Sequence, residues 1–313
     1  MGSVILCPIC EGPTKLLSFG VVAPWILVLW GLDPKNPVGT QLRCCHVCHL
    51  SFFAYRYSKQ EVKQIYENYR ESDWFQNRNF FEPWYRKGTN EAYVDNQKNI
   101  ASRMKFTSSL ISSAGINLSQ VTSFLDFGGD SGQFFPLDFN GKKILFDIQS
   151  HSQAMKDGVY RVSSLHDLAG SIDMVTNCYV LEHMSDINNG VIELKKCLKR
   201  NGFLLVELPY DRFKVSYFHR TSLYRTYLSV IYRRLFLFRL IDFITGVYRQ
   251  FFNKIPFFGV VKQSEHINYF DDLAIVKLIQ DHNFEILYSS KPQRKSFVGI
   301  IKQGRFGIVA QKL

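Results

Sequence analysis

Short apolar runs alternate with helix-like patterns between about residues 120 and 207. This alternation is typical of a parallel sheet with helices on both faces, so the sequence predicts an α/β fold. Two later runs, Phe284–Ser290 and Phe306–Gln311, could add a final antiparallel pair to the sheet. The expected parallel strands are Ser123–Phe127, Lys143–Asp147, Val159–Val162, Asp173–Asn177 and Phe203–Glu207.

Two other segments have patterns of their own. Residues from about Ser58 to Ser113 place polar and apolar positions at helical spacing. The segment 211–262 carries 10 Lys and Arg against 2 Asp, a net +8 of the chain's +11, and 14 aromatic residues. Several of its aromatic and aliphatic residues, from Tyr224 to Tyr248, recur at near-helical intervals. One interpretation is a lid that docks an anionic or membrane-bound molecule; the other is a packed helical hairpin with solvated arginines.

Composition narrows the class of protein. At 313 residues and 46% apolar content the chain has room for one large globular domain and a smaller one. The run Val21–Trp30 contains Pro24 and is too short to span a bilayer, and Cys7 and Pro8 interrupt any amino-terminal signal segment. We therefore expect a cytoplasmic protein, with peripheral contact to the inner face of the membrane through 211–262 as an open possibility.

Four of the seven cysteines form two C-x2-C pairs, Cys7/Cys10 and Cys45/Cys48, separated by a 34-residue loop. Two such turns supply the four thiolates of a tetrahedral zinc site, which in this closed form is structural. Cys44, His46 and His49 are close enough in sequence to be alternative ligands. This pattern also favours a reducing compartment over a disulfide framework.

A glycine-rich turn follows the first expected strand. It runs Asp126-Phe-Gly128-Gly129-Asp130-Ser-Gly132, and the next strand ends in Asp147, 21 residues after Asp126. A strand, a glycine turn and a distal carboxylate form a nucleoside-binding half-site, in which the carboxylate accepts ribose hydroxyls. The spacing does not fit the G-x-G-x-x-G fingerprint of dinucleotide sites.

A third motif, DMVTNCYVLEHMSD from Asp173, follows at the expected interval. Together with LDFGGDSGQF and ILFDI it resembles the class I S-adenosylmethionine-dependent methyltransferases, which implies their Rossmann-like seven-stranded sheet and their cofactor. The chain departs from the family motif at Asp130, which stands where the middle glycine is usual. The link that follows contains Pro136, so we expect its helix to be brief.

The resemblance extends to the amino terminus, where CPIC…APWI…LRCCHVCHLSFFAYRYSKQEVKQIYENYR is similar to the zinc-ribbon region of bacterial methyltransferases from polysaccharide and natural-product gene sets. It implies a sugar or glycan precursor, nucleotide- or lipid-linked, as the acceptor. The expected division is a zinc-ribbon region at 1–57, a helical cover at 58–119 and a methyltransferase domain at 120–313.

The resemblance also assigns roles to residues. Asp126, Gly128, Gly129, Asp130 and Gly132 would form the turn under the cofactor, and Asp147 and Ile148 would meet its ribose. The remaining cofactor residues would be Ser164 and Leu165 at the adenine and Asn177 and Tyr179 at the methionyl portion. His266, in an EHIN element, and His183 are the candidate bases, although each could be a structural histidine.

Two other functions remain open. A zinc knot and basic charge are compatible with nucleic-acid methylation. The Asn/Asp-Pro-Pro-Tyr/Phe turn of amino-methylating enzymes is, however, replaced here by Asn177-Cys-Tyr-Val. A methyltransferase fold that binds without catalysis is the other alternative, which Asp130 in the glycine turn keeps open.

Overall fold

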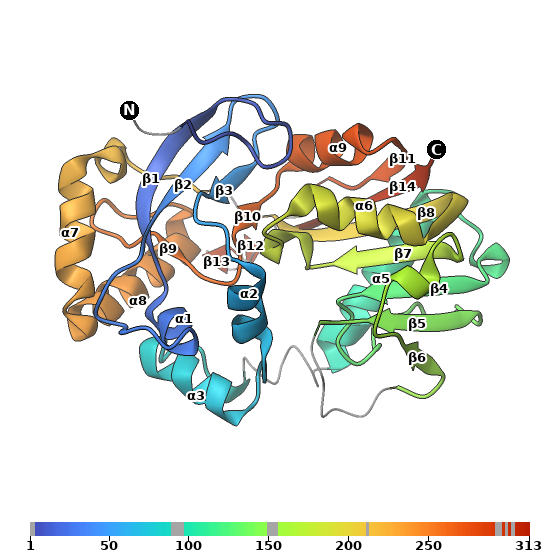
Figure 1. Ribbon diagram of the computed structural model, residues 1–313, viewed down its shortest axis with the longest axis horizontal. Coiled ribbons are helices and arrows are strands. Elements are labelled where there is room, and N and C mark those ends of the chain that lie inside the picture. Colours follow the sequence, from blue (N-terminus) through green and yellow to red (C-terminus); the bar gives the residue numbers. More distant parts are fainter. Residues whose placement is uncertain are drawn as a thin grey trace. The chain divides into compact units, whose positions relative to one another are not determined.

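The computed structural model describes residues 4–88, 97–148, 156–210, 213–291, 296–297, 300–301 and 304–313. The chain divides into two compact units (Figure 1). Unit 1 contains Met1–Lys87, Tyr210–Leu273 and Arg294–Gly304, and unit 2 contains Gly88–Pro209, Ala274–Gln293 and Arg305–Leu313. This division differs from the expected one, because the first part of the helical cover and the whole basic insertion belong to unit 1. Residues 211 and 212, at the start of that insertion, lie outside the described part.

Unit 2 is built on the seven-stranded sheet that the sequence predicts. The strand order is β11-β14-β8-β7-β4-β5-β6, with β4, β5, β6, β7 and β8 parallel and β11 antiparallel to β14. The expected α/β fold class is confirmed. The strands are β4 (Ser123–Phe127), β5 (Lys142–Phe146), β6 (Val159–Arg161), β7 (Ile172–Cys178), β8 (Leu198–Tyr210), β11 (Phe284–Ser289) and β14 (Gly304–Lys312).

Apolar helix faces cover this sheet. The helices are α5 (Gln97–Ser113), α6 (Ile187–Cys197) and α9 (Asp272–Asp281), joined by the short 3-10 turns η1 (Leu118–Gln120), η2 (His166–Leu168) and η3 (Leu181–His183). Leu110 of α5 packs in one cluster with Phe124 of β4 and Leu205 of β8. In α6 the buried residues recur at helical spacing, and the Asp186 side chain caps the helix by accepting from the Asn189 N–H.

The connection from β4 to β5 differs from the expectation of a brief helix. Residues 128–141, all of them described, form turns without a helix. Pro136 has no N–H to donate within a helix, and Phe135 and Phe139 instead pack edge-on against Phe124. Aromatic packing therefore fixes the shape of this connection.

Unit 1 contains a five-stranded sheet of order β10-β3-β2-β1-β9. The sequence predicts a long loop between the cysteine pairs. In the structure this segment contains β1 (Thr14–Val22), α1 (Pro24–Leu29) and most of β2 (Gly39–Cys45). The other strands are β3 (Ser51–Phe53), β9 (Lys262–Gln263) and β10 (Asn268–Tyr269). β9 pairs with β1 and β10 pairs with β3, so a segment more than 200 residues away closes both edges of this sheet. A separate pair, β12 (Ser296–Phe297) and β13 (Ile300–Ile301), completes the described strands.

Helices and aromatic residues make up the rest of unit 1. They are α2 (Lys59–Tyr66), α3 (Ser72–Phe81), η4 (Tyr217–Arg220), α7 (Ser222–Tyr232) and α8 (Leu235–Phe252). Trp25 meets Trp74 edge-on with 5.3 Å between ring centroids, and the Tyr232 hydroxyl donates to the Val22 carbonyl at 2.9 Å. Among the described helices of the chain, none is long and apolar enough to cross a membrane.

A network of buried charges ties α3 and α8 to β9. The Arg78 guanidinium bonds Glu82 at 3.0 Å and Glu265 at 2.7 Å, and the Lys262 ammonium bonds Glu82 and Asp242. These carboxylates are almost fully buried, so removing one partner would leave an uncompensated charge inside the unit.

Candidate functional site

The cofactor residues expected in unit 2 come together at one edge of its sheet. β4 pairs in parallel with β5 and with β7, which places Phe127 beside Phe146 and Asn177. The carboxyl ends of the three central strands therefore meet, and the Gly128 N–H donates to the Phe146 carbonyl at 2.7 Å. This edge of an open parallel sheet is where such folds bind ligands.

The glycine turn leaves no room for side chains at three positions. A Cβ on Gly129 would lie 2.1 Å from Asp126 Oδ2, and one on Gly128 would lie 2.5 Å from Val180 Cγ2. A Cβ on Gly132 would lie 2.9 Å from Val159 Cγ1. Gly128 and Gly132 also have φ angles of +75° and +77°, a region that side chains rarely adopt. The protein's own side chains therefore require glycine at these three positions, which fixes the path of the turn.

Asp130, the departure from the family motif, fits this turn. Its φ of +59° is left-handed, and Asp is one of the few residues besides glycine that tolerate this conformation. Its N–H donates to Asp147 Oδ2 at 3.0 Å, which orients the carboxylate expected to bind ribose. Asp130 is thus compatible with the turn, and its backbone N–H, which a glycine would also offer, joins the turn to the carboxylate that follows β5.

Buried polar groups without partners lie behind the turn. Thr176 donates to Asp126 Oδ1 at 2.9 Å, but Asp126 Oδ2 has no hydrogen-bond partner among the described residues. Burial raises the pKa of Asp126 to about 6. The side chain of Asn177 is fully buried, and within the same described residues both its amide atoms lack partners. Such groups are rare in native proteins, so these atoms are candidates to bond a ligand.

Tyr179 lies just beyond the end of β7 with a φ of +60°, and its N–H donates to the Glu207 carbonyl at 2.9 Å. Burial raises the pKa of its hydroxyl well above the ordinary value. The Arg103 guanidinium lies 3.7 Å from the ring centroid of Phe134 and 5.0 Å from that of Tyr179.

Arg103 is a residue that sequence reasoning missed. The helical pattern predicted α5, but nothing in that pattern distinguishes Arg103 from the other basic residues of the segment. Its positive charge lowers the pKa of Asp126 and of Glu207 against the stronger effect of burial.

Three other expected cofactor residues lie on the neighbouring loops. Ile148 follows Asp147 directly and is 61% exposed. Ser164 and Leu165 follow β6, where the Ser164 hydroxyl accepts from the His166 N–H at 3.2 Å and Leu165 precedes η2. Their assignment to ribose and adenine stays a prediction.

The two candidate bases belong to different units. His183 ends η3 in unit 2, with Nε2 at 4.0 Å from Glu182 Oε1. Glu182 is buried, and burial raises its pKa to about 8, so it is protonated at neutral pH. His266 belongs to unit 1, and the choice between the two histidines stays a prediction.

The loop that carries His266 is held firmly within unit 1. It joins β9 to β10, and the Tyr269 hydroxyl donates to the His266 carbonyl at 3.1 Å. Arg78 holds Glu265 on one side of His266, and Arg56 donates to Asn268 Oδ1 at 2.7 Å on the other. Burial lowers the pKa of His266 to about 4, so its imidazole is neutral at physiological pH, although the same shift makes it a weaker base than an exposed histidine.

The four cysteines of the two C-x2-C pairs form a compact cluster in unit 1. Their sulfurs all lie within 4.8 Å of one another, with Cys7 3.5 Å from Cys48 and Cys10 3.5 Å from Cys45. A tetrahedral zinc with Zn–S bonds of about 2.3 Å needs sulfurs about 3.8 Å apart. Cys44, an alternative ligand in the sequence, instead directs its thiol toward the His49 carbonyl. The cluster therefore has the composition and spacing of a closed zinc site.

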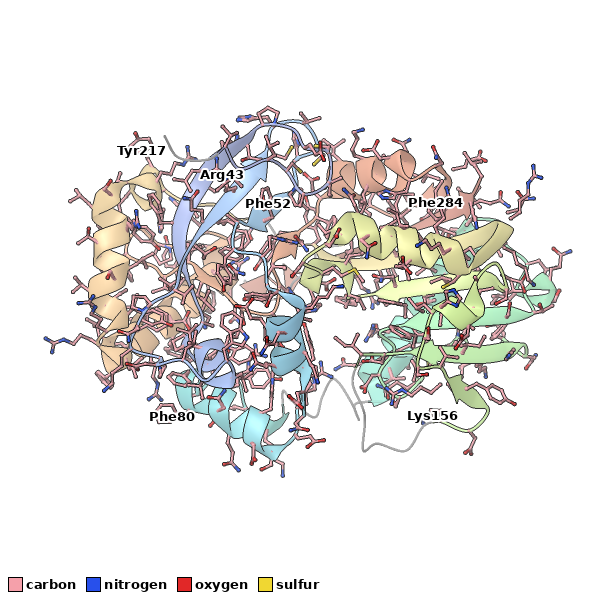
Figure 2. All side chains as sticks on the ribbon, in the orientation of Figure 1. Arg43, Phe52, Phe80, Lys156, Tyr217 and Phe284 are labelled. Atoms are coloured by element: carbon pink, nitrogen blue, oxygen red, sulfur yellow. The ribbon has the colours of Figure 1, made fainter. Side chains whose placement is uncertain are left out.

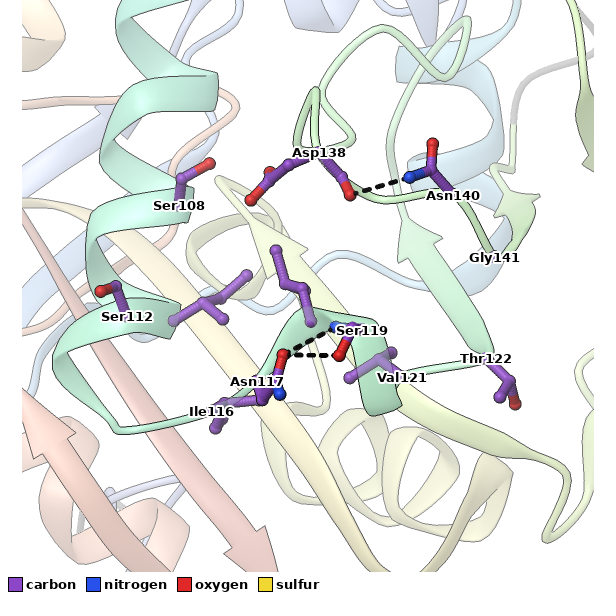
Figure 3. A pocket seen from close by; sticks show the side chains of 12 residues that line it. Ser108, Ser112, Ile116, Asn117, Ser119, Val121, Thr122, Asp138, Asn140 and Gly141 are labelled. Carbon is purple, nitrogen blue, oxygen red and sulfur yellow. Dashed lines mark hydrogen bonds between the residues drawn. The ribbon is translucent and has the colours of Figure 1, made fainter.

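A hollow at the other end of the unit 2 sheet is not part of this edge (Figure 3). It is lined by Ser108 and Ser112 of α5 and by Thr122, Asp138 and Asn140 near the amino ends of β4 and β5. Gly128 and Asp147 lie at the carboxyl ends of the same strands.

The donor set at the carboxyl edge fits S-adenosylmethionine. A nucleoside with a cationic aminoacyl arm needs a glycine turn for close approach, an acceptor for ribose hydroxyls and buried acceptors for an ammonium group. The glycine turn, Asp147 and Asp126 Oδ2, which has no partner among the described residues, supply these three features.

A comparison with protein families agrees with the sequence motifs. The family model described as "Methyltransferase domain" matches residues 66–289, more than two thirds of the chain. No curated protein matches the sequence.

The chain is also similar to solved structures, at low identity. One is the 1,6-didemethyltoxoflavin-N1-methyltransferase of Burkholderia thailandensis, with 11% identity, 70% of this chain and 81% of that chain covered, and a TM-score of 0.40. Another is the magnesium protoporphyrin IX methyltransferase of Synechocystis PCC 6803, with 16% identity, coverage of 70% and 84%, and a TM-score of 0.39. A third is a possible histamine N-methyltransferase of Thermotoga maritima, with 16% identity, coverage of 71% and 97%, and a TM-score of 0.39.

The family assignment rests on the family match and on the sheet, not on these three likenesses. The chain belongs to the methyltransferase domain family and is an S-adenosylmethionine-dependent methyltransferase of class I.

Proposed function

We propose that this methyltransferase acts on a sugar or glycan precursor and holds S-adenosylmethionine at the carboxyl edge of the unit 2 sheet. The cofactor site is supported by the glycine turn at the carboxyl edge. There the Asp130 N–H orients Asp147, and Asp126 Oδ2 has no hydrogen-bond partner among the described residues.

In this proposal Asp147 accepts the ribose hydroxyls and Ser164 and Leu165 flank the adenine. The cofactor supplies a methyl group on an activated sulfonium, so alignment of donor and acceptor does most of the catalytic work. Asn177 and Tyr179 would position the methionyl arm, and Arg103, stacked on Phe134, would offer a cation for its carboxylate.

A base is needed only if the acceptor atom must lose a proton, as a hydroxyl or a carbon acid must. His266 is the preferred base because its imidazole is neutral and because strand pairing and ionic contacts hold its loop at both ends. His183, beside Glu182, is the second candidate.

The sugar acceptor is supported by the likeness of the amino-terminal segment and the EHIN element to bacterial polysaccharide methyltransferases. In the structure these two segments belong to one sheet, since β9 and β10 flank the EHIN element and pair with β1 and β3. A zinc ion bound by Cys7, Cys10, Cys45 and Cys48 would then stabilise the sheet that carries His266.

The test is the release of S-adenosylhomocysteine from S-adenosylmethionine with separate panels of nucleotide-linked sugars, lipid-linked sugars and nucleic acids. We expect turnover with a sugar panel that Asp147→Ala greatly reduces. The control Asp138→Ala, at the opposite end of the sheet, should leave it unchanged. Turnover with nucleic acids alone would contradict the proposal of a sugar acceptor. Cofactor binding without turnover in any panel would favour a protein that binds the cofactor but does not catalyse methyl transfer.

A further inference from the structure

Helix α8 of unit 1 has an unusual distribution of apolar residues. The side chains on its inner face include Asp242 and Thr245, which are 7% and 5% exposed. Six apolar residues recur every three or four positions on the opposite face and are 38–80% exposed: Phe236, Leu240, Phe243, Ile244, Val247 and Phe251. Residues at this spacing share one side of a helix. The helix therefore carries a continuous apolar stripe on its outer side.

Basic residues surround this stripe. Arg233 and Arg234 are exposed just before α8, and Lys254 is exposed just after it. From Arg220 to Lys254 the chain has seven Lys and Arg and one acidic residue, Asp242, a formal net charge of +6. Asp242 is buried and paired with Lys262, so within this stretch the exposed charge is entirely positive.

Segments near α8 also expose aromatic side chains. Figure 1 shows α7 beside α8, and Figure 2 labels two further aromatic residues, Tyr217 at the start of η4 and Phe80 on α3. They are 78% and 59% exposed, and the Arg239 guanidinium lies 5.3 Å from the ring centroid of Phe80. Phe257 adds another exposed ring beyond the end of α8, at 61%.

We propose that the outer face of α8 binds the surface of an anionic lipid bilayer, with the helix lying in the plane of the headgroups. An apolar stripe flanked by Arg and Lys is the pattern of helices that lie at a membrane interface. The apolar stripe enters the boundary between headgroups and acyl chains, while Arg233, Arg234 and Lys254 meet lipid phosphates. Charge complementarity selects this occupant over a second copy of the chain, because two copies would bring the positive charges of two such helices together. The proposal does not depend on the acceptor or the cofactor.

The experiment is flotation of the full chain, without cofactor, with vesicles of equal parts phosphatidylglycerol and phosphatidylcholine, and with vesicles of phosphatidylcholine alone. We expect binding to the anionic vesicles that weakens with added salt, and little binding to the neutral ones. A parent protein that does not float with the anionic vesicles overturns the proposal.

Variants test whether vesicle binding depends on the apolar stripe of α8 or on exposed apolar side chains in general. Phe243→Ser with Phe251→Ser should lower the bound fraction by at least about fivefold, because both rings enter the acyl boundary. The matched control is Leu137→Ser in unit 2, an apolar side chain that is 86% exposed, and it should bind as the parent does. An equal loss in the control contradicts the proposal.

A second pair of variants tests the charges with residues that are exposed and make no core contact. Arg233→Glu with Arg234→Glu should abolish flotation, whereas Lys35→Glu with Lys105→Glu, the same change in net charge at exposed sites outside the hairpin, should not. If instead the parent forms dimers by light scattering and the Phe243→Ser/Phe251→Ser variant is monomeric without any effect on vesicles, the face is a self-association surface and the proposal fails.

Discussion

The two units differ in how their buried carboxyl groups are paired, although each unit also holds buried neutral groups without a described hydrogen-bond partner, such as Trp25 Nε1 in unit 1 and Asn177 in unit 2. In unit 1 the buried side chains of Arg78, Glu82, Asp242, Lys262 and Glu265 bond one another in a single network. At the carboxyl edge of unit 2, Asp126 Oδ2, both amide atoms of Asn177 and both carboxylate oxygens of Glu182 lack hydrogen-bond partners within the described residues.

The difference separates a scaffold from a binding site. Paired buried charges hold elements that are far apart in sequence, because each charge is uncompensated without the other. Unpartnered buried groups cost free energy in the unbound protein, and a ligand that bonds them recovers it. By this comparison the ion pairs of unit 1 hold a loop in place, and the unpaired buried carboxyl groups of unit 2 are candidates to bond a polar ligand.

Loss of the metal is expected to have the largest effect on this contrast. Removing zinc with a chelator, or replacing Cys45 with Ala, should unfold the sheet of unit 1, because structural zinc in small domains contributes about 10–16 kcal/mol of apparent binding free energy. Metal analysis of the purified protein should give close to one zinc per chain. The matched control is Cys44→Ala, next to the cluster but outside it. A metal-free protein that stays folded and active would refute the zinc site.

Replacing His266 tests whether the held loop serves chemistry. His266→Ala should lower turnover by about 10²–10⁴-fold while cofactor affinity is unchanged. The pKa of His266 is lowered to about 4, and only its neutral form accepts a proton. Turnover of the parent should therefore fall as pH drops toward about 4, and the variant should lack this acid limb. Unchanged turnover would move the role to His183 or remove the need for a base.

Breaking the network of unit 1 should destabilise it by several kcal/mol. Lys262→Met leaves Glu82 and Asp242 buried without their cation, and losses of about 3–5 kcal/mol in the free energy of unfolding are typical of such changes. The control Lys277→Met breaks the ion pair with Asp281, which is more exposed than the pairs of Lys262. It should lower the free energy of unfolding by less than about 1 kcal/mol. Equal urea midpoints for the Lys262 variant and the parent would show that the network does not hold the unit.

The smallest effect concerns Glu182. Its folded pKa, about 8, lies above its ordinary value of 4.5, so the folded state binds the extra proton and stability falls as pH rises through this range. Glu182→Gln removes the titratable carboxyl group. The free energy of unfolding of the variant, relative to that of the parent, should therefore rise by about 1–3 kcal/mol between about pH 6 and about pH 9. Thermal unfolding at several pH values measures this difference. A constant difference would mean that Glu182 is charged in the fold.

Local signals predicted unit 2 well. The run Ser123–Phe127 coincides with β4 because all five residues are buried and the glycine turn ends the strand sharply. β8 is longer than expected, since it begins at Leu198 and includes the polar residues Lys199, Arg200 and Asn201, which carry no apolar signal. The C-x2-C spacing also identified the four cysteines that the structure brings together.

Contacts between distant segments could not be predicted. The pairing of β9 with β1 joins residues about 240 positions apart, and two-residue strands have no pattern of their own. The basic insertion therefore looked like an addition to the methyltransferase sheet, although it belongs to unit 1. Arg103 was missed for the same reason. Its candidate role depends on its contacts with Phe134 and Tyr179, which are distant in sequence, and not on its position in the helical pattern.

The central claim, that the carboxyl edge of unit 2 binds S-adenosylmethionine, is tested most directly by calorimetry on the parent, Asp147→Ala and the control Asp138→Ala. Loss of the charge-assisted bonds to ribose should weaken binding by about 1–3 kcal/mol in Asp147→Ala, roughly 5- to 150-fold in Kd. Asp138→Ala, at the other end of the sheet, should bind as the parent does. Equal affinity of Asp147→Ala and the parent would contradict the assignment of this edge.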